Sequence, residues 1–201
     1  MHLGMSGDFR IAPAESVGEP GKHDHVIFRM SSGKTIVFSD VRRFGFMDLV
    51  PPGAAAKHPA LKVLGPEPLS PDFNAAFLAR ALKGKKTSLK AALLDQRVVA
   101  GLGNIYASEA LHRARLSPRR RASTIATPSG APREAAQHLV DAIKQVLTEA
   151  IDRASTNNYR GGRFRVYDRE GKPCLRPRCP GVIRRRTQAG RSTFYCPICQ
   201  R

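Results

Sequence analysis

Four cysteines near the end of the sequence carry its clearest chemistry. Two cysteine pairs separated by a spacer of hairpin length are typical ligands of one structural, tetrahedral Zn²⁺ ion. Two disulfides are the alternative. The sequence opens without the charged and then apolar pattern of a signal peptide, so a reducing compartment and bound metal are favoured. The only cysteines among the 201 residues, in the order C-x4-C-x16-C-x2-C, are Cys174, Cys179, Cys196 and Cys199.

The spacer between the two cysteine pairs is strongly basic, with Arg184, Arg185, Arg186 and Arg191. The whole chain has 34 Lys and Arg against 16 Asp and Glu, a formal net charge of +18. Such an excess indicates a polyanionic partner, and nucleic acid is favoured over an anionic membrane surface or a merely dispersing charge. No run approaches the ~20 apolar residues of a membrane span, so we expect no membrane partner and a cytoplasmic location.

Residues 1–52 are expected to form the first of three domains, an antiparallel sheet that looks like part of a larger sandwich. Short apolar or alternating runs separated by turn residues are typical of such strands. Pro51 and Pro52 then break the pattern. The expected strands are residues 7–12, 26–30, 35–39 and 45–50.

Residues 53–160 are expected to form a helical domain, and residues 161–201 a four-cysteine zinc finger. Apolar residues recur three and four positions apart after each capping signal. The predicted fold class is therefore α+β: a partial antiparallel β-sandwich, a helical domain and a zinc-finger β-hairpin. The first two expected helices have their caps at Ser70 and at Thr87 or Ser88. Asn104 opens the third, which runs to about His112, and the last covers residues 133–153.

The turn at residues 101–109, Gly-Leu-Gly-Asn-Ile-Tyr-Ala-Ser-Glu, resembles the helix–two-turn–helix of bacterial formamidopyrimidine-DNA glycosylases. That family excises oxidised purines such as 8-oxoguanine. The resemblance covers nearly the whole chain. It implies base-excision repair of damaged double-stranded DNA by a nucleoid-associated monomer that needs no nucleotide cofactor. Five further segments match the family in its own order, at residues 2–7, 22–25, 40–45, 64–69 and 190–196.

The resemblance also assigns roles to single residues. Asn104 opens a helix after two glycines, where free N–H groups favour a phosphate, and it is expected to contact the DNA backbone beside the lesion. Arg191 is expected to grip the phosphates around the lesion and to assist strand cleavage, so it is the one catalytic candidate. By residue type alone, Lys86 and Lys90 could equally form a solvated helix face. The further expected DNA contacts are His2, His23, Lys86, Lys90 and Tyr106.

Met5, Arg42 and Phe44 are candidates for handling a flipped base, because flipping costs on the order of a few kcal/mol and leaves a hole in the duplex. The resemblance makes Met5 the filler, Phe44 the wedge and Arg42 the reader of the opposite cytosine. By residue type alone, Met5 and Phe44 would fit core packing. The run Arg42-Arg43-Phe44-Gly45 at the expected entry to a strand favours exposure instead.

The sequence shows no match to the family's catalytic groups. These are an N-terminal proline that attacks the sugar, an adjacent glutamate and a lysine that assists β,δ-elimination. His2 matches a segment well inside the usual protein, so we expect an N-terminally truncated chain with a marginal partial sandwich. Two functions stay open: a bifunctional glycosylase and abasic-site lyase, or a module that binds damaged DNA without cutting it.

Two further alternatives are less favoured. An endonuclease VIII-type enzyme would prefer oxidised pyrimidines, but Met5 with Arg42 and Phe44 favours the purine branch. A zinc-ribbon RNA-binding or ribosomal protein would not need the helix–two-turn–helix. Residues 155–162 are shorter than the mobile loop of the family, which leaves the lesion preference open.

Overall fold

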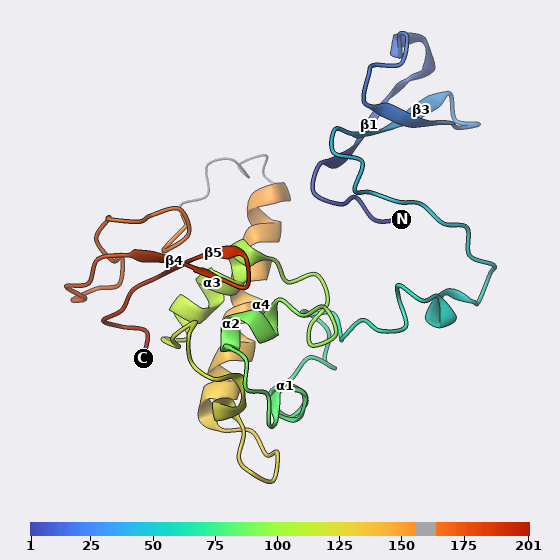
Figure 1. Cartoon of the computed structure of the whole chain (residues 1–201). Helices are drawn as coiled ribbons and strands as arrows, with labels where there is room; N and C mark the ends of the chain where they lie inside the picture. Colours follow the sequence, from blue (N-terminus) through green and yellow to red (C-terminus); the bar gives the residue numbers. More distant parts are fainter. Residues whose placement is uncertain (156–163) are drawn as a thin grey trace. The chain divides into compact units, whose positions relative to one another are not determined.

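The computed structural model describes residues 1–155 and 164–201 (Figure 1). Its contacts divide the chain into two compact units, Met1–His58 and Pro59–Arg201. Small antiparallel sheets combined with helices confirm the α+β class. The finer division at residues 52 and 160 stays a prediction. Among the described residues, no helix is long and apolar enough to cross a bilayer.

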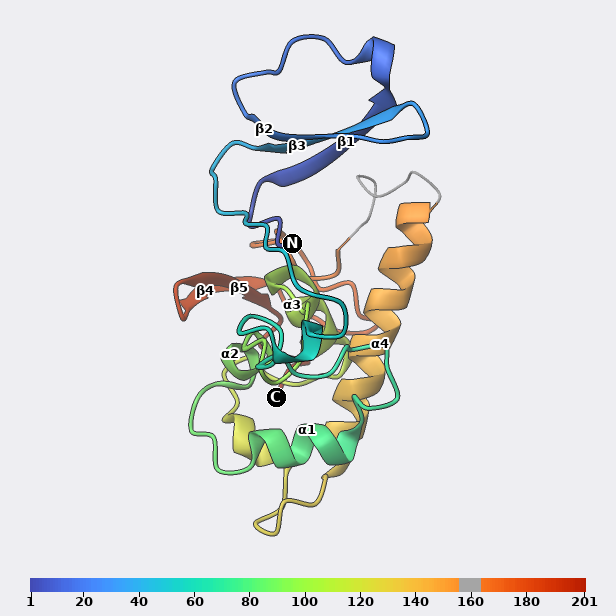
Figure 2. The same ribbon diagram turned by 90° about the vertical axis from the view of Figure 1, so that its right-hand side faces the viewer.

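The first unit contains a three-stranded antiparallel sheet of β1 (Gly7–Pro13), β2 (Asp24–Arg29) and β3 (Lys34–Asp40) in the order β1-β3-β2 (Figure 2). Two short 3-10 helices, η1 (Ala14–Ser16) and η2 (Ala55–Lys57), complete its regular structure.

The prediction of a fourth strand at residues 45–50 is wrong. This segment makes only an isolated bridge, in which Phe46 exchanges two backbone hydrogen bonds with His2. Pro51 and Pro52 follow directly and have no N–H to continue a ladder.

One face of this sheet is apolar and open to solvent. The register places Ile11 beside Ile36, and Ile36 beside Phe28, so the three side chains share a face. Ile11 is 63% exposed, and no second layer covers the face within the described part of this unit. The apolar exposure expected of a partial sandwich is therefore present.

The second unit is built around α4 (Glu134–Ser155), whose buried stripe of Leu139, Ile143 and Val146 recurs three to four residues apart (Figure 1). The shorter helices surround it and share one apolar core that includes the fully buried Phe73, Leu82 and Leu111. These elements are α1 (Ala75–Leu82), α2 (Leu89–Leu93), α3 (Asn104–Arg113) and the 3-10 helix η3 (Ala122–Ile125).

Of the two predicted helix caps, the structure contradicts the first and confirms the second. The first helix begins at Ala75, and its cap is Asn74 rather than Ser70. The Asn74 amide accepts a hydrogen bond from the Phe77 N–H and donates one to the Pro71 carbonyl, which keeps the preceding residues in a turn. Ser88 does cap α2, accepting a bond from the Ala91 N–H at 3.3 Å.

The second unit ends in a β-hairpin of β4 (Arg184–Gln188) and β5 (Arg191–Tyr195). Its two turn residues, Ala189 and Gly190, both have positive φ, as the tight turn of a hairpin requires. Strand β5 packs against α3, which brings the hairpin to the helix–two-turn–helix segment.

Candidate functional site

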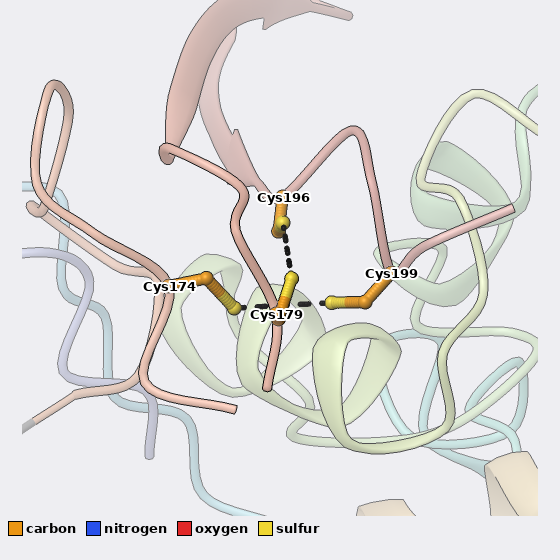
Figure 3. Close-up of side chains that lie close together, drawn as sticks. All are labelled: Cys174, Cys179, Cys196 and Cys199. Atoms are coloured by element: carbon orange, nitrogen blue, oxygen red, sulfur yellow. Dashed lines mark hydrogen bonds between the residues drawn. The ribbon is translucent and has the colours of Figure 1, made fainter. Parts of the chain in front are cut away.

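The four cysteines converge as their spacing predicts (Figure 3). All four Sγ atoms lie within 4.8 Å of one another, with Cys179 and Cys196 at 3.6 Å and Cys174 and Cys199 at 3.9 Å. A tetrahedron with metal–sulfur bonds of about 2.3 Å has sulfur–sulfur edges of about 3.8 Å, so the cluster can hold one metal ion. Burial raises the pKa of the Cys174 thiol and raises that of Cys199 to about 12. A bound cation is therefore needed to keep these thiols ionised.

His112, on α3, connects the helical part of the unit to this cluster. Its ring is fully buried, and Nε2 lies 3.4 Å from the Cys174 sulfur. Burial, together with the nearby Arg176, Arg165 and Arg113, lowers the pKa of His112 to about 4. The imidazole is therefore neutral at pH 7. Sequence reasoning missed this contact, because nothing in the sequence pairs a helix histidine with one of four cysteines.

The hairpin is tied to the helix–two-turn–helix through one carbonyl group, that of Ser192. The Asn104 Nδ2 donates to the Ser192 carbonyl at 3.0 Å. The Lys90 Nζ donates to the same oxygen at 2.9 Å and to the Thr193 hydroxyl at 2.8 Å. Because Arg191 immediately precedes this carbonyl, the three bonds fix its backbone beside the N-terminus of α3.

Lys90 is not the exposed side chain of a solvated helix face. Its residue is only 1% exposed, whereas Lys86 is exposed in the loop before α2. Desolvation and the nearby Arg191 lower the pKa of Lys90 to about 8. In the free chain, Lys90 therefore holds the hairpin in place, and its contact with DNA stays a prediction.

The N-terminus of α3 has no side-chain cap. Its N-cap is Gly103, and the first N–H groups of a helix have no acceptor within the helix. Gly103 has an ordinary φ of −98°, and a Cβ added there would meet nothing within 4 Å. The fold itself therefore does not require this glycine. The bare backbone leaves room for a phosphate to approach the helix dipole.

Glu109, on the same helix, holds the segment that precedes the first of the four cysteines. Its carboxylate accepts backbone hydrogen bonds from Arg165, Val166 and Tyr167 at 2.8–2.9 Å. Glu109 is nearly buried, and the half-buried Tyr106 packs against the core one turn earlier. The motif at residues 101–109 includes Glu109, but its anchoring role emerges only from the tertiary structure.

In the first unit, Asp40 organises the other predicted site residues. Its carboxylate accepts hydrogen bonds from the Ser6 hydroxyl at 2.5 Å and from the Gly45 N–H at 2.8 Å. The Ser6 bond is the largest cause, and the Gly45 bond the next, that lowers the pKa of Asp40. Gly4 has a φ of +63°, and a Cβ there would lie 2.7 Å from the Phe44 carbonyl carbon. The two loops that carry Met5 and Phe44 therefore lie against each other.

Met5, Arg42 and Phe44 come together at this junction. The Arg42 guanidinium donates to the Met5 sulfur at 3.6 Å. Met5 is 72% exposed and Phe44 is 62% exposed. Neither side chain is packed in a core, and the exposure predicted from the run at residues 42–45 is confirmed for Phe44.

The two predicted histidines lie in the same unit. The His2 ring stacks on Phe46 with centroids 5.5 Å apart, and its Nδ1 accepts a bond from the Gly4 N–H. His23 is half-buried, and its carbonyl accepts a bond from the Asp40 N–H. Their roles in DNA binding stay predictions. The prediction of a short loop at residues 155–162 falls mostly on residues 156–163, which lie outside the described residues.

Comparisons with known proteins agree with these features. Residues 1–47 match the formamidopyrimidine-DNA glycosylase N-terminal domain, and residues 64–160 match the formamidopyrimidine-DNA glycosylase H2TH domain. The formamidopyrimidine-DNA glycosylase of Bradyrhizobium sp. (strain ORS 278) is 56% identical over all of this chain and 76% of its own length. The corresponding protein of Rhodopseudomonas palustris (strain BisB18) is 54% identical with the same coverage.

Solved structures show the same likeness. The Lactococcus lactis glycosylase, bound to DNA containing an abasic site, matches with a TM-score of 0.85 and 31% identity over all of this chain and 72% of its own. The Thermus thermophilus protein matches with a TM-score of 0.80 and 41% identity over 98% of this chain and 73% of its own. The chain therefore belongs to the formamidopyrimidine-DNA glycosylase family.

Proposed function

We propose that this chain binds damaged double-stranded DNA in base-excision repair, within an activity that excises oxidised purines and cleaves the abasic site. The observation that carries the proposal is the Ser192 carbonyl shared by Asn104 and Lys90. It fixes the backbone of Arg191 beside the open N-terminus of α3. A guanidinium anchored beside the N-terminus of a helix can form a site for phosphate.

A metal ion bound by the four cysteines would make the hairpin that carries Arg191 rigid. A Zn²⁺ ion bound by Cys174, Cys179, Cys196 and Cys199 would have no open coordination position, so it would stabilise the fold rather than act on substrate. The hairpin is then held at one end by the metal and along β5 by Lys90 and Asn104. An arginine on such a support loses little conformational freedom when it meets a phosphate.

The first unit would supply the groups that enter the duplex. The exposed Met5 and Phe44 present a flexible thioether and a flat ring, both of which can fill the space of an extruded base. The Arg42 guanidinium beside them can donate to the acceptor edge of the orphaned cytosine. These three side chains together favour a purine lesion opposite cytosine over an oxidised pyrimidine.

Binding without cutting is the second candidate, and the position of Lys90 favours it. Among the residues that match the family's DNA contacts, Lys90 has the amine with the lowered pKa. That amine is buried and donates to two acceptors, so it is unavailable to attack a sugar.

We further propose that the protein works as a monomer in the bacterial cytoplasm. The relatives above are bacterial enzymes, and the hairpin and helix–two-turn–helix that would grip the phosphate belong to one compact unit of a single chain. The chemistry proposed here needs no nucleotide cofactor.

One experiment separates the two candidates. The purified chain is mixed with a duplex that contains 8-oxoguanine opposite cytosine, with and without borohydride. The enzyme function predicts a trapped covalent adduct, because reduction captures a Schiff base between an amine and the sugar. The binding function predicts a stable complex without an adduct. If the chain does not prefer this duplex to an undamaged one, both candidates fail.

A further inference from the structure

A second basic surface lies in the Pro59–Arg201 unit, away from Arg191. It is a groove of about 560 Å³ between the loop after α1 and the segment from η3 to the beginning of α4. In both views of the fold, η3 and the loop that follows it lie at the end of this unit away from β4 and β5 (Figures 1 and 2). The side chains that give the groove its chemistry are Lys83, Arg120, Arg121, Arg133, Ser123 and Thr127.

The backbone makes one wall of this groove rigid. The Ala122 N–H donates to the Thr87 carbonyl at 2.9 Å, and the Ser123 N–H donates to the Lys85 carbonyl at 3.2 Å. Ala122 and Ile125 are fully buried beneath this wall. The cations are therefore mounted on a fixed part of the core rather than on a free loop.

The positive charges in the groove are not neutralised by the protein. Arg120 donates to the Thr124 hydroxyl at 2.6 Å, Arg133 to the Ala126 carbonyl at 3.1 Å, and Lys83 to the Ser129 carbonyl at 3.3 Å. All three acceptors are uncharged. In the described part of the chain, none of the four cations forms an ion pair with a carboxylate, in contrast to Arg113, which pairs with Glu149 at 2.7 Å.

We propose that this groove binds the sugar–phosphate backbone of a second DNA segment, while the Asn104 and Arg191 site holds the damaged one. The proposal rests on the proposed function for its ligand class. Guanidinium, ammonium and hydroxyl groups are the usual contacts to DNA phosphates, and the groove has no aromatic lining on which bases could stack. Its lack of acidic residues suits a polyanion of any sequence. A protein with two such surfaces can transfer from one DNA segment to another while one surface stays bound.

The test uses two duplexes and the full chain. The chain is first saturated with a short duplex that contains an abasic-site analogue. A labelled, undamaged duplex is then added, and its binding is followed by anisotropy and by energy transfer to the first duplex. The wild-type chain is expected to form this ternary complex. If the saturated wild-type chain binds no second duplex, the proposal is overturned.

Two double variants with the same change in net charge locate the contact. Arg121→Glu with Arg133→Glu removes two exposed cations from the groove, whereas Arg115→Glu with Lys172→Glu removes two exposed cations elsewhere in the unit. The groove variant is expected to bind the second duplex about 10-fold more weakly or worse. Its log–log salt slope should be shallower by about 1.8, because each phosphate contact contributes roughly 0.9. Equal losses in both variants would overturn the proposal.

The remaining readouts separate this proposal from the main one. The groove variant should bind the first duplex like wild type, and Arg121→Lys with Arg133→Lys should retain the second duplex because it keeps the charge. Loss of the second duplex in this lysine variant would overturn the phosphate assignment. Failure of Asn104→Ala and Arg191→Ala to weaken the first duplex would instead count against the proposed function, whatever the groove does.

Discussion

The two compact units hold their candidate site residues in opposite ways. In Pro59–Arg201, Lys90 and Asn104 are bonded into the interior and share the Ser192 carbonyl. In Met1–His58, Met5 and Phe44 are mostly exposed on two loops that meet around Asp40. The geometry of the site therefore depends closely on folding in the second unit and much less so in the first. Substitutions of Lys90 and Asn104 should therefore damage stability and binding together, whereas substitutions of Met5 and Phe44 should damage binding alone.

Removal of a metal ion from the four cysteines should reduce stability more than any other change. It should unfold part of the second unit and leave the first unit folded. Chelation, or Cys196→Ser, is expected to unfold the hairpin, since a structural zinc site contributes about 10–16 kcal/mol, comparable with the whole stability of a domain. Amide signals of β4 and β5 should collapse in an NMR spectrum, while those of β1 to β3 persist. Simultaneous loss of the β1 to β3 signals would show that the units are not independent.

Lys90→Met should lower the stability of the second unit by about 1–3 kcal/mol, because Thr193 and Ser192 then lose a buried donor. Lys86→Met is the matched control: it lies four residues away and is exposed, so a change within about 0.5 kcal/mol is expected. Thermal unfolding of both variants provides the measurement. Equal effects would mean that Lys90 does not hold the hairpin.

The lowered pKa of Lys90 predicts that the free energy of unfolding depends on pH. The pKa of Lys90 falls from an ordinary value of 10.5 to about 8 in the folded chain, so between these values the unfolded chain binds more protons. The free energy of unfolding should therefore rise with pH from about 8 to about 10.5, as the penalty for a buried charge is relieved. Denaturant titrations across this range should show the rise in wild type and a smaller rise in Lys90→Met.

Gly103→Ala should separate binding from stability at the N-terminus of α3. A Cβ fits there without a clash, so the stability cost should be about 1 kcal/mol or less, from the weaker N-cap. Affinity for a lesion duplex is expected to fall about 10-fold, because the methyl group occupies the approach to the helix N–H groups. Gly18→Ala, also at an open position with no positive φ, is the control and should leave affinity unchanged. Unchanged affinity in Gly103→Ala would mean that no phosphate approaches this backbone.

Phe44→Ala should have the smallest effect on stability, within about 0.5 kcal/mol, because the ring is 62% exposed. It should still impair extrusion of the damaged base, which can be followed with a fluorescent base analogue placed beside the lesion. Leu49→Ala removes an apolar side chain that is 97% exposed and serves as the control. Equal base extrusion in both variants would argue against a wedge.

The sequence predicts best where the chemistry depends on local spacing. The four cysteines, the cap at Ser88 and the glycine turn before Asn104 all act within a few residues or follow a strict ligand pattern. The exposure of Phe44 could also be predicted, because Arg42 and Arg43 directly precede it and arginine is mostly exposed in proteins.

The features of the site that could not be predicted depend on contacts between elements that are far apart in the sequence. Helical spacing predicts one face for Lys86 and Lys90, but α2 begins only at Leu89, and the hairpin packed over Lys90 makes that residue interior. Glu109 and His112 bond to residues more than fifty positions away, which no local period reveals. The mistaken strand at 45–50 has the same origin, since its apolar run is real but its partner contributes a single bridge.

The phosphate site at Arg191 can be tested by comparing the affinity of Arg191→Ala for an abasic-site duplex with that of Arg186→Ala at one salt concentration. Both substitutions remove one arginine from the same hairpin, but only Arg191 adjoins the carbonyl held by Asn104 and Lys90. Loss of a charged hydrogen bond worth about 1.5–3 kcal/mol should weaken Arg191→Ala at least 10-fold and leave Arg186→Ala within about threefold of wild type. Equal affinities of the two variants would contradict a phosphate grip built at this position.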